Sequence, residues 1–202
     1  MKKDYFQHKS KDYEKDSKRV KNVSNIADAI KRSVKFEMSM HIMDFGSGTG
    51  LLLEKIAPLV GKITAVDVSK SMITELAAKR ETIDCELEIL EMDLSVSKPE
   101  AKFDGIISSM TMHHVKDISA MFHKFYEMLN EKGFIAIADL DKEDGTFHTE
   151  DTGVFHNGFD REEFISFAKN AGFKDLEIMS ASSAVKPHGE YPVFLLVGYK
   201  YL

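Results

Sequence analysis

The sequence predicts a doubly wound α/β fold, in which helices cover both faces of a mostly parallel sheet. Strand-like and helix-like segments alternate along nearly the whole chain, as they do in successive βαβ units. The segment FDGIISSM is apolar without alternation, which is typical of a strand covered on both faces. A glycine-rich stretch, HIMDFGSGTG at residues 41–50, joins a strand-like segment to a helix-like one. In such sheets ligands bind beyond the carboxyl ends of the strands.

Each element has a local signal in the sequence. Apolar residues recur at helical spacing in 17–35, and Asp16, Ser69, Asp117 and Asp160 are placed to cap the starts of four helices. The predicted helices cover 17–35, 50–57, 118–129 and 161–171, and another begins after Ser69 and includes Met72, Ile73, Leu76 and Ala77 on one side. The predicted strands cover 40–45, 62–68, 85–94, 103–110, 133–140, 175–181 and 191–200. Residues 141–158, rich in Asp, Glu, Gly and His, form an insertion before the last helix.

Composition limits the class of protein. A chain of 202 residues favours one domain, which we divide into a helical lid segment, 1–37, and a main domain, 38–202. The formal net charge is −6, yet residues 1–35 hold 11 Lys and Arg against 5 Asp and Glu. We interpret this basic stretch as a solvated helix face rather than a nucleic-acid surface, because the rest of the chain is acidic. With Cys85 as the single cysteine and no long apolar run, we expect a cytoplasmic protein without membrane contact.

The glycine loop discriminates between two ligands. A dinucleotide fingerprint requires glycine where Leu51 stands, so that motif fails. Asp44, two residues ahead of Gly46, would repel a pyrophosphate but suits a ligand with positive charge. S-adenosylmethionine carries an α-ammonium and a sulfonium, so we expect Asp44 to lie near its ammonium group. The sequence therefore favours S-adenosylmethionine, with S-adenosylhomocysteine as its product.

Two further acids follow predicted strands. Asp67 comes 17 residues after Gly50, where a carboxylate can accept both ribose hydroxyls. Asp93 follows the next strand and is placed to accept the adenine amino hydrogens. The alternative is that these aspartates only terminate strands or cap helices. Three strand-end acids in register with a glycine loop favour the cofactor interpretation.

These motifs resemble those of the class I S-adenosylmethionine-dependent methyltransferases, in the branch that includes ubiquinone and menaquinone methylases. The resemblance rests on MDFGSGTGLL, ITAVDVSKSM, LEMDLS, FDGIISSMTMHHVKD and LNEKGFIAIADLD. It implies the strand order 3-2-1-4-5-7-6 with an antiparallel last strand, and an N-terminal lid with Phe6 and Tyr13 at the substrate. It implies the following cofactor contacts: Asp44, Gly46, Ser47, Gly48, Asp67, Val68, Met72, Asp93, Leu94 and Ser109.

Methyl transfer depends mainly on alignment, and a general base is needed when the nucleophile carries a proton. The candidate bases are His113 and His114, just beyond the fourth strand, and His148 and His156 in the insertion. A packing or capping role for His114 is the alternative. We expect no metal site, because these histidines lack the i,i+4 spacing of a helical site and no cysteine accompanies them.

The acceptor is expected to be a small, partly apolar molecule. The fourth strand ends in SSMT, not in the Asn/Asp-Pro-Pro-Tyr/Phe run of adenine and glutamine methylases, and no separate nucleic-acid-binding domain is apparent. We expect a monomer or homodimer. Two alternatives stay open at this point: a non-enzymatic regulatory protein that binds S-adenosylmethionine or S-adenosylhomocysteine, and an NAD-dependent oxidoreductase.

Overall fold

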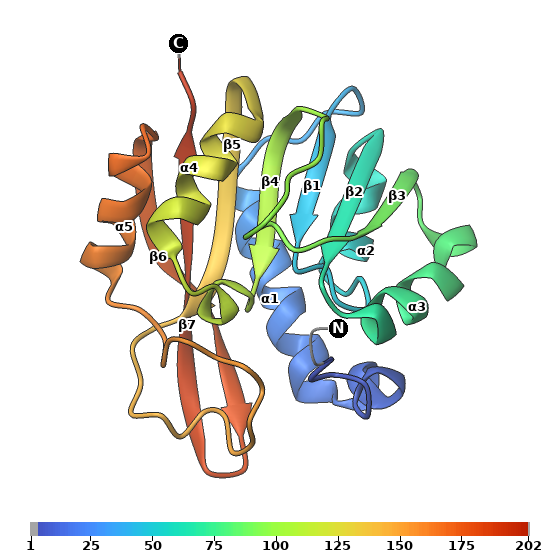
Figure 1. The fold of residues 1–202 in the computed structure, drawn as a ribbon, viewed down its shortest axis with the longest axis vertical. Coiled ribbons are helices and arrows are strands. Elements are labelled where there is room, and N and C mark those ends of the chain that lie inside the picture. The colour runs from blue at the N-terminus through green and yellow to red at the C-terminus, as the bar shows by residue number, and fades with distance from the viewer. Residues whose placement is uncertain (1–3, 202) are drawn as a thin grey trace.

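The computed structural model describes residues 4–201 and is built around a seven-stranded sheet of order β3-β2-β1-β4-β5-β7-β6 (Figure 1). Strands β1 to β5 pair in parallel, whereas β7 runs antiparallel to both β5 and β6. The predicted fold class, strand order and edge hairpin are therefore confirmed.

The elements follow the predicted alternation. The strands are β1 (His41–Phe45), β2 (Lys62–Asp67), β3 (Glu86–Glu91), β4 (Phe103–Ser109), β5 (Leu129–Leu140), β6 (Lys174–Lys186) and β7 (Gly189–Tyr199). The α-helices are α1 (Ser17–Ser33), α2 (Leu53–Ile56), α3 (Lys70–Ala78), α4 (Ile118–Met128) and α5 (Arg161–Asn170). Short 3₁₀ helices are η1 (Ser10–Lys15), η2 (Ala57–Leu59), η3 (Arg80–Thr82) and η4 (Met112–His114).

Two apolar layers hold the sheet. One joins α1 and α2 to the sheet through buried residues such as Ile26, Ile30 and Leu53, and the other joins α4 and α5 through Phe122 and Phe164. Fully burying a side chain of this kind contributes about 1.5–3 kcal/mol. Because helices cover both faces, the central strands carry the continuous apolar runs seen in the sequence.

The four expected helix caps are present. The carboxylates of Asp16, Asp117 and Asp160 and the hydroxyl of Ser69 accept backbone N–H groups of the first turn that follows each. Each such cap contributes about 1 kcal/mol. These bonds fix where α1, α3, α4 and α5 begin, and so set where the preceding loops lie.

Elements α2, β5 and β6 differ most from the sequence prediction, and β6 continues to Lys186, beyond the predicted end at residue 181. Helix α2 is much shorter than 50–57, because the glycine loop takes its first turn and Pro58 lies in the 3₁₀ turn that follows it. Strand β5 begins at Leu129, directly after α4, whereas we expected this strand to begin at residue 133. The β4–β5 register shifts here, and Lys132 adopts a φ of 64°.

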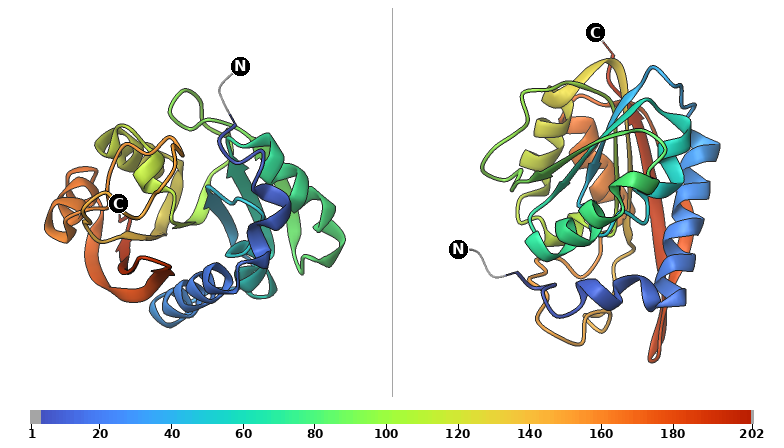
Figure 2. Two further views of the ribbon diagram at one scale, coloured as in Figure 1. Left: turned by 90° about the horizontal axis from the view of Figure 1, so that it is seen from below. Right: turned by 90° about the vertical axis from the view of Figure 1, so that its right-hand side faces the viewer.

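The N-terminal segment and the loop between β5 and α5 lie at the same end of the sheet (Figures 1 and 2). Helix α1 runs along the β6–β7 side of the sheet and belongs to its core. Within residues 4–201 no helix has the length and apolar character needed to cross a bilayer.

Candidate cofactor and acceptor site

A cavity opens at the carboxyl end of the parallel strands. Four stretches that are far apart in the sequence line it: the N-terminal segment with the start of α1, the glycine loop, the turn after β4, and the 141–160 loop with the end of β6. Its lining includes Phe6, Lys9, Tyr13, Arg19, Asn22, Asp44, Gly46, Ser47, Gly48, Thr49, Ser109, Met110, His113, His114, Phe147, His148 and Lys186.

The glycine loop is held by backbone bonds and by close packing. The amides of Gly46 and Ser47 both donate to the carbonyl of Val66, at 2.8 and 3.2 Å. A Cβ at Gly46 would come within 2.2 Å of Thr111 atoms, so packing requires glycine there. Gly48 differs, because its φ is +55° and a Cβ would meet no atom within 4 Å. The backbone at Gly48 therefore faces open space in the cavity.

Asp44 is the penultimate residue of β1 and is a buried acid in the lining of this cavity. It is 1% exposed, and its Oδ2 atom is buried without a hydrogen-bond partner among residues 4–201. Burial raises the pKa of Asp44 to about 8, and the nearby charge of Asp67 adds to the shift. A cationic ligand group would stabilise the ionised form of this carboxylate. The α-ammonium of S-adenosylmethionine matches that requirement.

Asp67 is the last residue of β2, and its carboxylate supports the glycine loop. Its Oδ2 accepts the Gly48 amide and its Oδ1 accepts the Ser69 amide, both at 2.8 Å. Burial raises the pKa of Asp67, while these amide bonds lower it. Tyr13 lies close enough for the Asp67 charge to affect its phenol, whose pKa is raised mainly by burial. Asp67 thus connects the glycine loop to the N-terminal segment.

Other predicted cofactor residues lie outside the cavity lining. Met72 and Leu94 are buried at 3% and 1% exposure, whereas Val68 is 61% exposed. Asp93 accepts a hydrogen bond from the Ser95 amide at 2.8 Å, within its own turn. This bond agrees with the alternative that Asp93 only terminates its strand. These residues follow β2 and β3, at the edge where an adenine ring would extend, and the cofactor role of each stays a prediction.

The N-terminal segment crosses the mouth of the cavity. Asp4 accepts hydrogen bonds from the Ser69 hydroxyl and the Ser71 amide at the start of α3. On the opposite side Lys9 pairs with Glu150 at 2.6 Å. The segment therefore connects α3 to the 141–160 loop, in the position expected of a lid.

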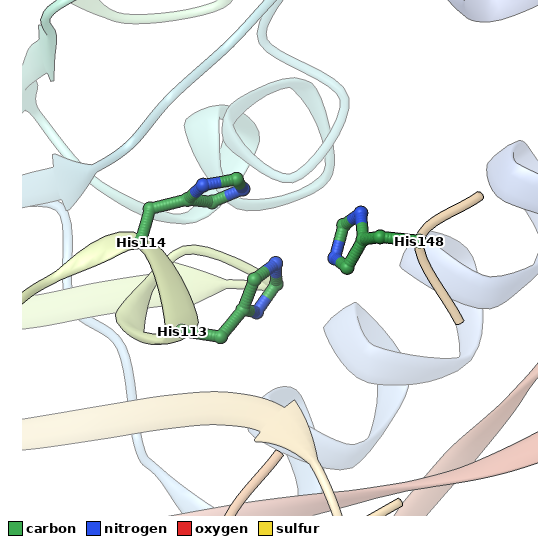
Figure 3. Close-up of side chains that lie close together, drawn as sticks. All are labelled: His113, His114 and His148. Carbon is green, nitrogen blue, oxygen red and sulfur yellow. The ribbon is translucent and has the colours of Figure 1, made fainter. Parts of the chain in front are cut away.

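Three of the four predicted histidines gather at one end of this cavity (Figure 3). The ring centroid of His113 lies 4.4 Å from that of His114 and 5.1 Å from that of His148. His156 does not line the cavity, since its Nε2 bonds to the Val115 carbonyl at 2.9 Å and its ring packs on Phe159. Nothing in the sequence spacing of the four histidines indicated that they lie together. The structure brings His113, His114 and His148 into one cluster.

The gathered histidines have fixed and poorly hydrated surroundings. The Nδ1 atom of His113 lies 2.7 Å from Oδ1 of Asp139, and the pair is 2% and 0% exposed. Burial lowers the pKa of His114 to about 4 and that of His148 to about 3, with His113 as the next cause in both. His114 and His148 are therefore neutral and weakly basic at physiological pH, and each has an unprotonated nitrogen that can accept a hydrogen bond.

Some residues of the site were not predicted as members. Asp139 lies at the carboxyl end of β5, so the rule that strand ends carry site residues indicated its position, but nothing in the sequence indicated His113 as its partner. Phe147, Arg19 and Lys186 line the cavity from three separate elements. Only the tertiary fold brings them together, so no local motif could have identified them.

Comparisons with known proteins agree with this geometry. A family model described as a methyltransferase domain matches residues 18–178. An uncharacterized methyltransferase of Schizosaccharomyces pombe is 28% identical over 162 residues, covering 72% of this chain and 57% of the relative. A ubiquinone biosynthesis O-methyltransferase of Pelagibacter ubique is 28% identical, covering 56% of this chain and 47% of the relative. The chain thus spans about half the length of the curated relatives it matches.

Solved structures support the fold. A chain from the complex of the Haloferax volcanii Trm112 methyltransferase activator with a methyltransferase superposes with a TM-score of 0.82 at 16% identity, and all of each chain is covered. At this identity the similarity establishes the fold alone. The family match covers most of the chain, and the glycine loop and unpartnered Asp44 carboxylate suit the expected cofactor. The chain therefore belongs to the methyltransferase-domain family, as a class I, S-adenosylmethionine-dependent member.

Proposed function

We propose that this protein transfers a methyl group from S-adenosylmethionine to a small, partly apolar acceptor that carries an anionic group. The observation that carries this proposal is a single cavity with two chemically different ends. The glycine loop and Asp44 line one end, and imidazoles, aromatic rings and cationic side chains line the other. Such a cavity suits a cofactor and an acceptor that must meet end to end.

At the cofactor end, S-adenosylmethionine would supply a methyl group activated by its sulfonium. Asp44 would bind the α-ammonium, and Asp67 would accept the ribose hydroxyls while it orients the Gly48 amide. The rigid loop fixes the direction in which the methyl group points. Alignment of this kind is worth about 7–11 kcal/mol of the barrier.

The acceptor end favours a flat anion. Phe6 packs edge-on against Tyr13 with ring centroids 6.4 Å apart, and Phe147 lies on the far side of the cavity. The Arg19 guanidinium lies 4.0 Å from the Tyr13 ring centroid, and Lys186 Nζ lies 4.6 Å from that of Phe147. Burial lowers the pKa of Lys186, and the charge of Arg19 lowers it further. An anionic acceptor would relieve this repulsion.

The test is methyl transfer from isotopically labelled S-adenosylmethionine to a panel of carboxylates, phosphates and phenols, each paired with its neutral ester or ether. We expect label in the anionic members, detected by mass spectrometry. Lys186→Gln should raise the KM for the acceptor and leave the affinity for S-adenosylhomocysteine unchanged. Lys174→Gln, at the opposite end of the same strand, is the matched control.

Two results would redirect the proposal. Tight binding of S-adenosylhomocysteine with no labelled acceptor would favour a regulatory, non-enzymatic protein. Equal transfer to the neutral partners would remove the anionic requirement. Family membership argues against an NAD-dependent oxidoreductase, and thermal shifts measured with NAD and with S-adenosylhomocysteine would check that directly.

A further inference from the structure

The histidine cluster suits a metal ion better than it suits three separate bases. We propose that His113, His114 and His148 bind one divalent transition-metal ion, with Zn²⁺ as the reference ion. One ring nitrogen from each lies within 4.8 Å of the others. This binding does not depend on the proposed methyl transfer and can be measured without it.

The spacing of the three rings is close to what a metal requires. Zinc–nitrogen bonds of 2.0–2.1 Å in a tetrahedral site place two nitrogens about 3.4 Å apart. Small rotations of the side chains bring nitrogens at the present separations to that distance. Figure 3 shows the rings approaching one space from two parts of the chain, His113 and His114 from η4 and His148 from the 141–160 loop.

Each ring also has a partner that fixes its orientation. Asp139 bonds to Nδ1 of His113, which leaves Nε2 for a ligand. The Thr152 hydroxyl lies 3.0 Å from Nδ1 of His148, and His114 bonds to the backbone of Gly153. Metal-binding histidines usually have such a partner on their second nitrogen, most often a carboxylate or a carbonyl. The His113–Asp139 pair has that arrangement with both members buried.

One nitrogen in the cluster lacks any protein partner. The Nε2 atom of His148 is buried and accepts or donates no hydrogen bond within residues 4–201. A buried polar atom without a hydrogen-bond partner lowers the stability of the folded protein unless a ligand pairs with it. Neutral imidazole is the form that binds metals, and an unpartnered ring nitrogen is available to a metal ion.

The ligand set selects a class of ion. Imidazole suits zinc, copper, iron and nickel, whereas magnesium and calcium prefer oxygen ligands. Three protein ligands leave a coordination position toward the cavity, as in catalytic rather than structural zinc sites. If the proposed function holds, the ion would bind an oxygen of the acceptor and orient it beside the cofactor. That consequence, unlike metal binding itself, rests on the proposed function.

The experiment uses full-length protein without an affinity tag, stripped with EDTA and dialysed. It is titrated with ZnCl₂ in a calorimeter and with CoCl₂ in a spectrophotometer. We expect one equivalent of zinc by elemental analysis and visible d–d bands from the cobalt protein. His148→Ala should weaken zinc binding by more than about 100-fold. Asp139→Asn should weaken it by about 10–100-fold, the usual effect of removing a residue that hydrogen-bonds to a metal-binding histidine. His123→Ala, an exposed histidine on α4, should bind like the wild type.

Two outcomes would overturn the proposal: no stoichiometric zinc binding by the wild type, or unchanged affinity in both His148→Ala and His113→Ala. Circular dichroism of the stripped variants shows whether each has folded. If His148→Ala has not folded, His148→Gln is measured in its place. Calorimetry with S-adenosylhomocysteine separates the two proposals. Zinc binding without methyl transfer to any acceptor would support the metal site and not the proposed function. Methyl transfer without zinc binding would overturn the metal site and leave the proposed function standing.

Discussion

The two ends of the cavity are built in different ways. The centre of the cofactor end is one stretch, from Asp44 to Ser69, in which the Gly48 and Ser69 amides donate to the Asp67 carboxylate. The acceptor end comes from the N-terminal segment, η4 and the 141–160 loop, and it uses side chains instead. If the proposed function holds, a largely local motif would recognise the cofactor, whereas segments from separate parts of the chain would determine the acceptor. Changes at the two ends should therefore have separable effects.

The largest effect is expected at the backbone of the loop. Gly48→Val would place a branched side chain in the cavity, so binding of S-adenosylhomocysteine should become undetectable by calorimetry. The positive φ of Gly48 should also cost about 1–3 kcal/mol of stability. Gly145→Val is the control, because Gly145 has a φ of +89° in a loop away from the cofactor end. Normal binding by Gly48→Val would mean that the loop does not hold the cofactor.

The next effect is expected at Asp67. Asp67→Ala should weaken S-adenosylhomocysteine binding by about 1.5–3 kcal/mol, the usual value of hydrogen bonds to a charged group. That is about a 10- to 150-fold loss of affinity. Asp104→Ala is the matched control, since Asp104 also accepts a backbone amide, that of His41 at 2.9 Å, but at the opposite end of the sheet. Equal affinities in the two variants would remove the ribose assignment.

Asp44 gives a pH dependence with a definite sign. Its pKa is raised in the folded protein to about 8, so its contribution to stability is complete below the unfolded value and is lost as pH rises toward 8. Without cofactor, the melting temperature should therefore fall between pH 6 and pH 9 more steeply in the wild type than in Asp44→Asn. S-adenosylhomocysteine should reduce that difference, because its ammonium stabilises the carboxylate. Identical pH profiles for the two proteins would contradict a buried, protonated Asp44.

The cofactor end was predictable because its signals are local. Asp44 and Asp67 lie at the carboxyl ends of two mostly apolar strands, and parallel strands bring these ends to one edge of the sheet. Caps such as Ser69 and Asp117 were equally readable, since the partner of each lies within three residues. The sheet order came from the family resemblance and is confirmed.

The acceptor end was not predictable in the same way. The sequence indicated His113 and His148 as separate candidates, but their distance depends on the path of an insertion without regular structure. The expectation of no metal site relied on helical spacing, which does not apply to residues on two loops. Asp139 was visible only as a strand end, and its bond to His113 needs the turn after β4 to fold back over β5.

The smallest effect is expected at the N-terminal segment, which closes the cavity by contacts at its two sides. The exposed Lys9–Glu150 pair should contribute little to stability, because solvent screens it. Asp4 at the start of α3 and Phe6, 5.9 Å from the His114 ring, are better placed to hold the segment closed. We expect residues 5–15 to exchange amide hydrogens more slowly once S-adenosylhomocysteine is bound.

Removing residues 1–15 should weaken S-adenosylhomocysteine binding without a large change in the melting temperature of the cofactor-free protein, because α1 and its core contacts remain. Lys11→Ala, at an exposed position of the same segment outside the cavity lining, is the control and should bind like the wild type. A segment that closes over bound ligand would exclude water from the reacting groups, as lids do. Unchanged exchange together with unchanged affinity after truncation would mean that the segment packs against the cavity without serving as a lid.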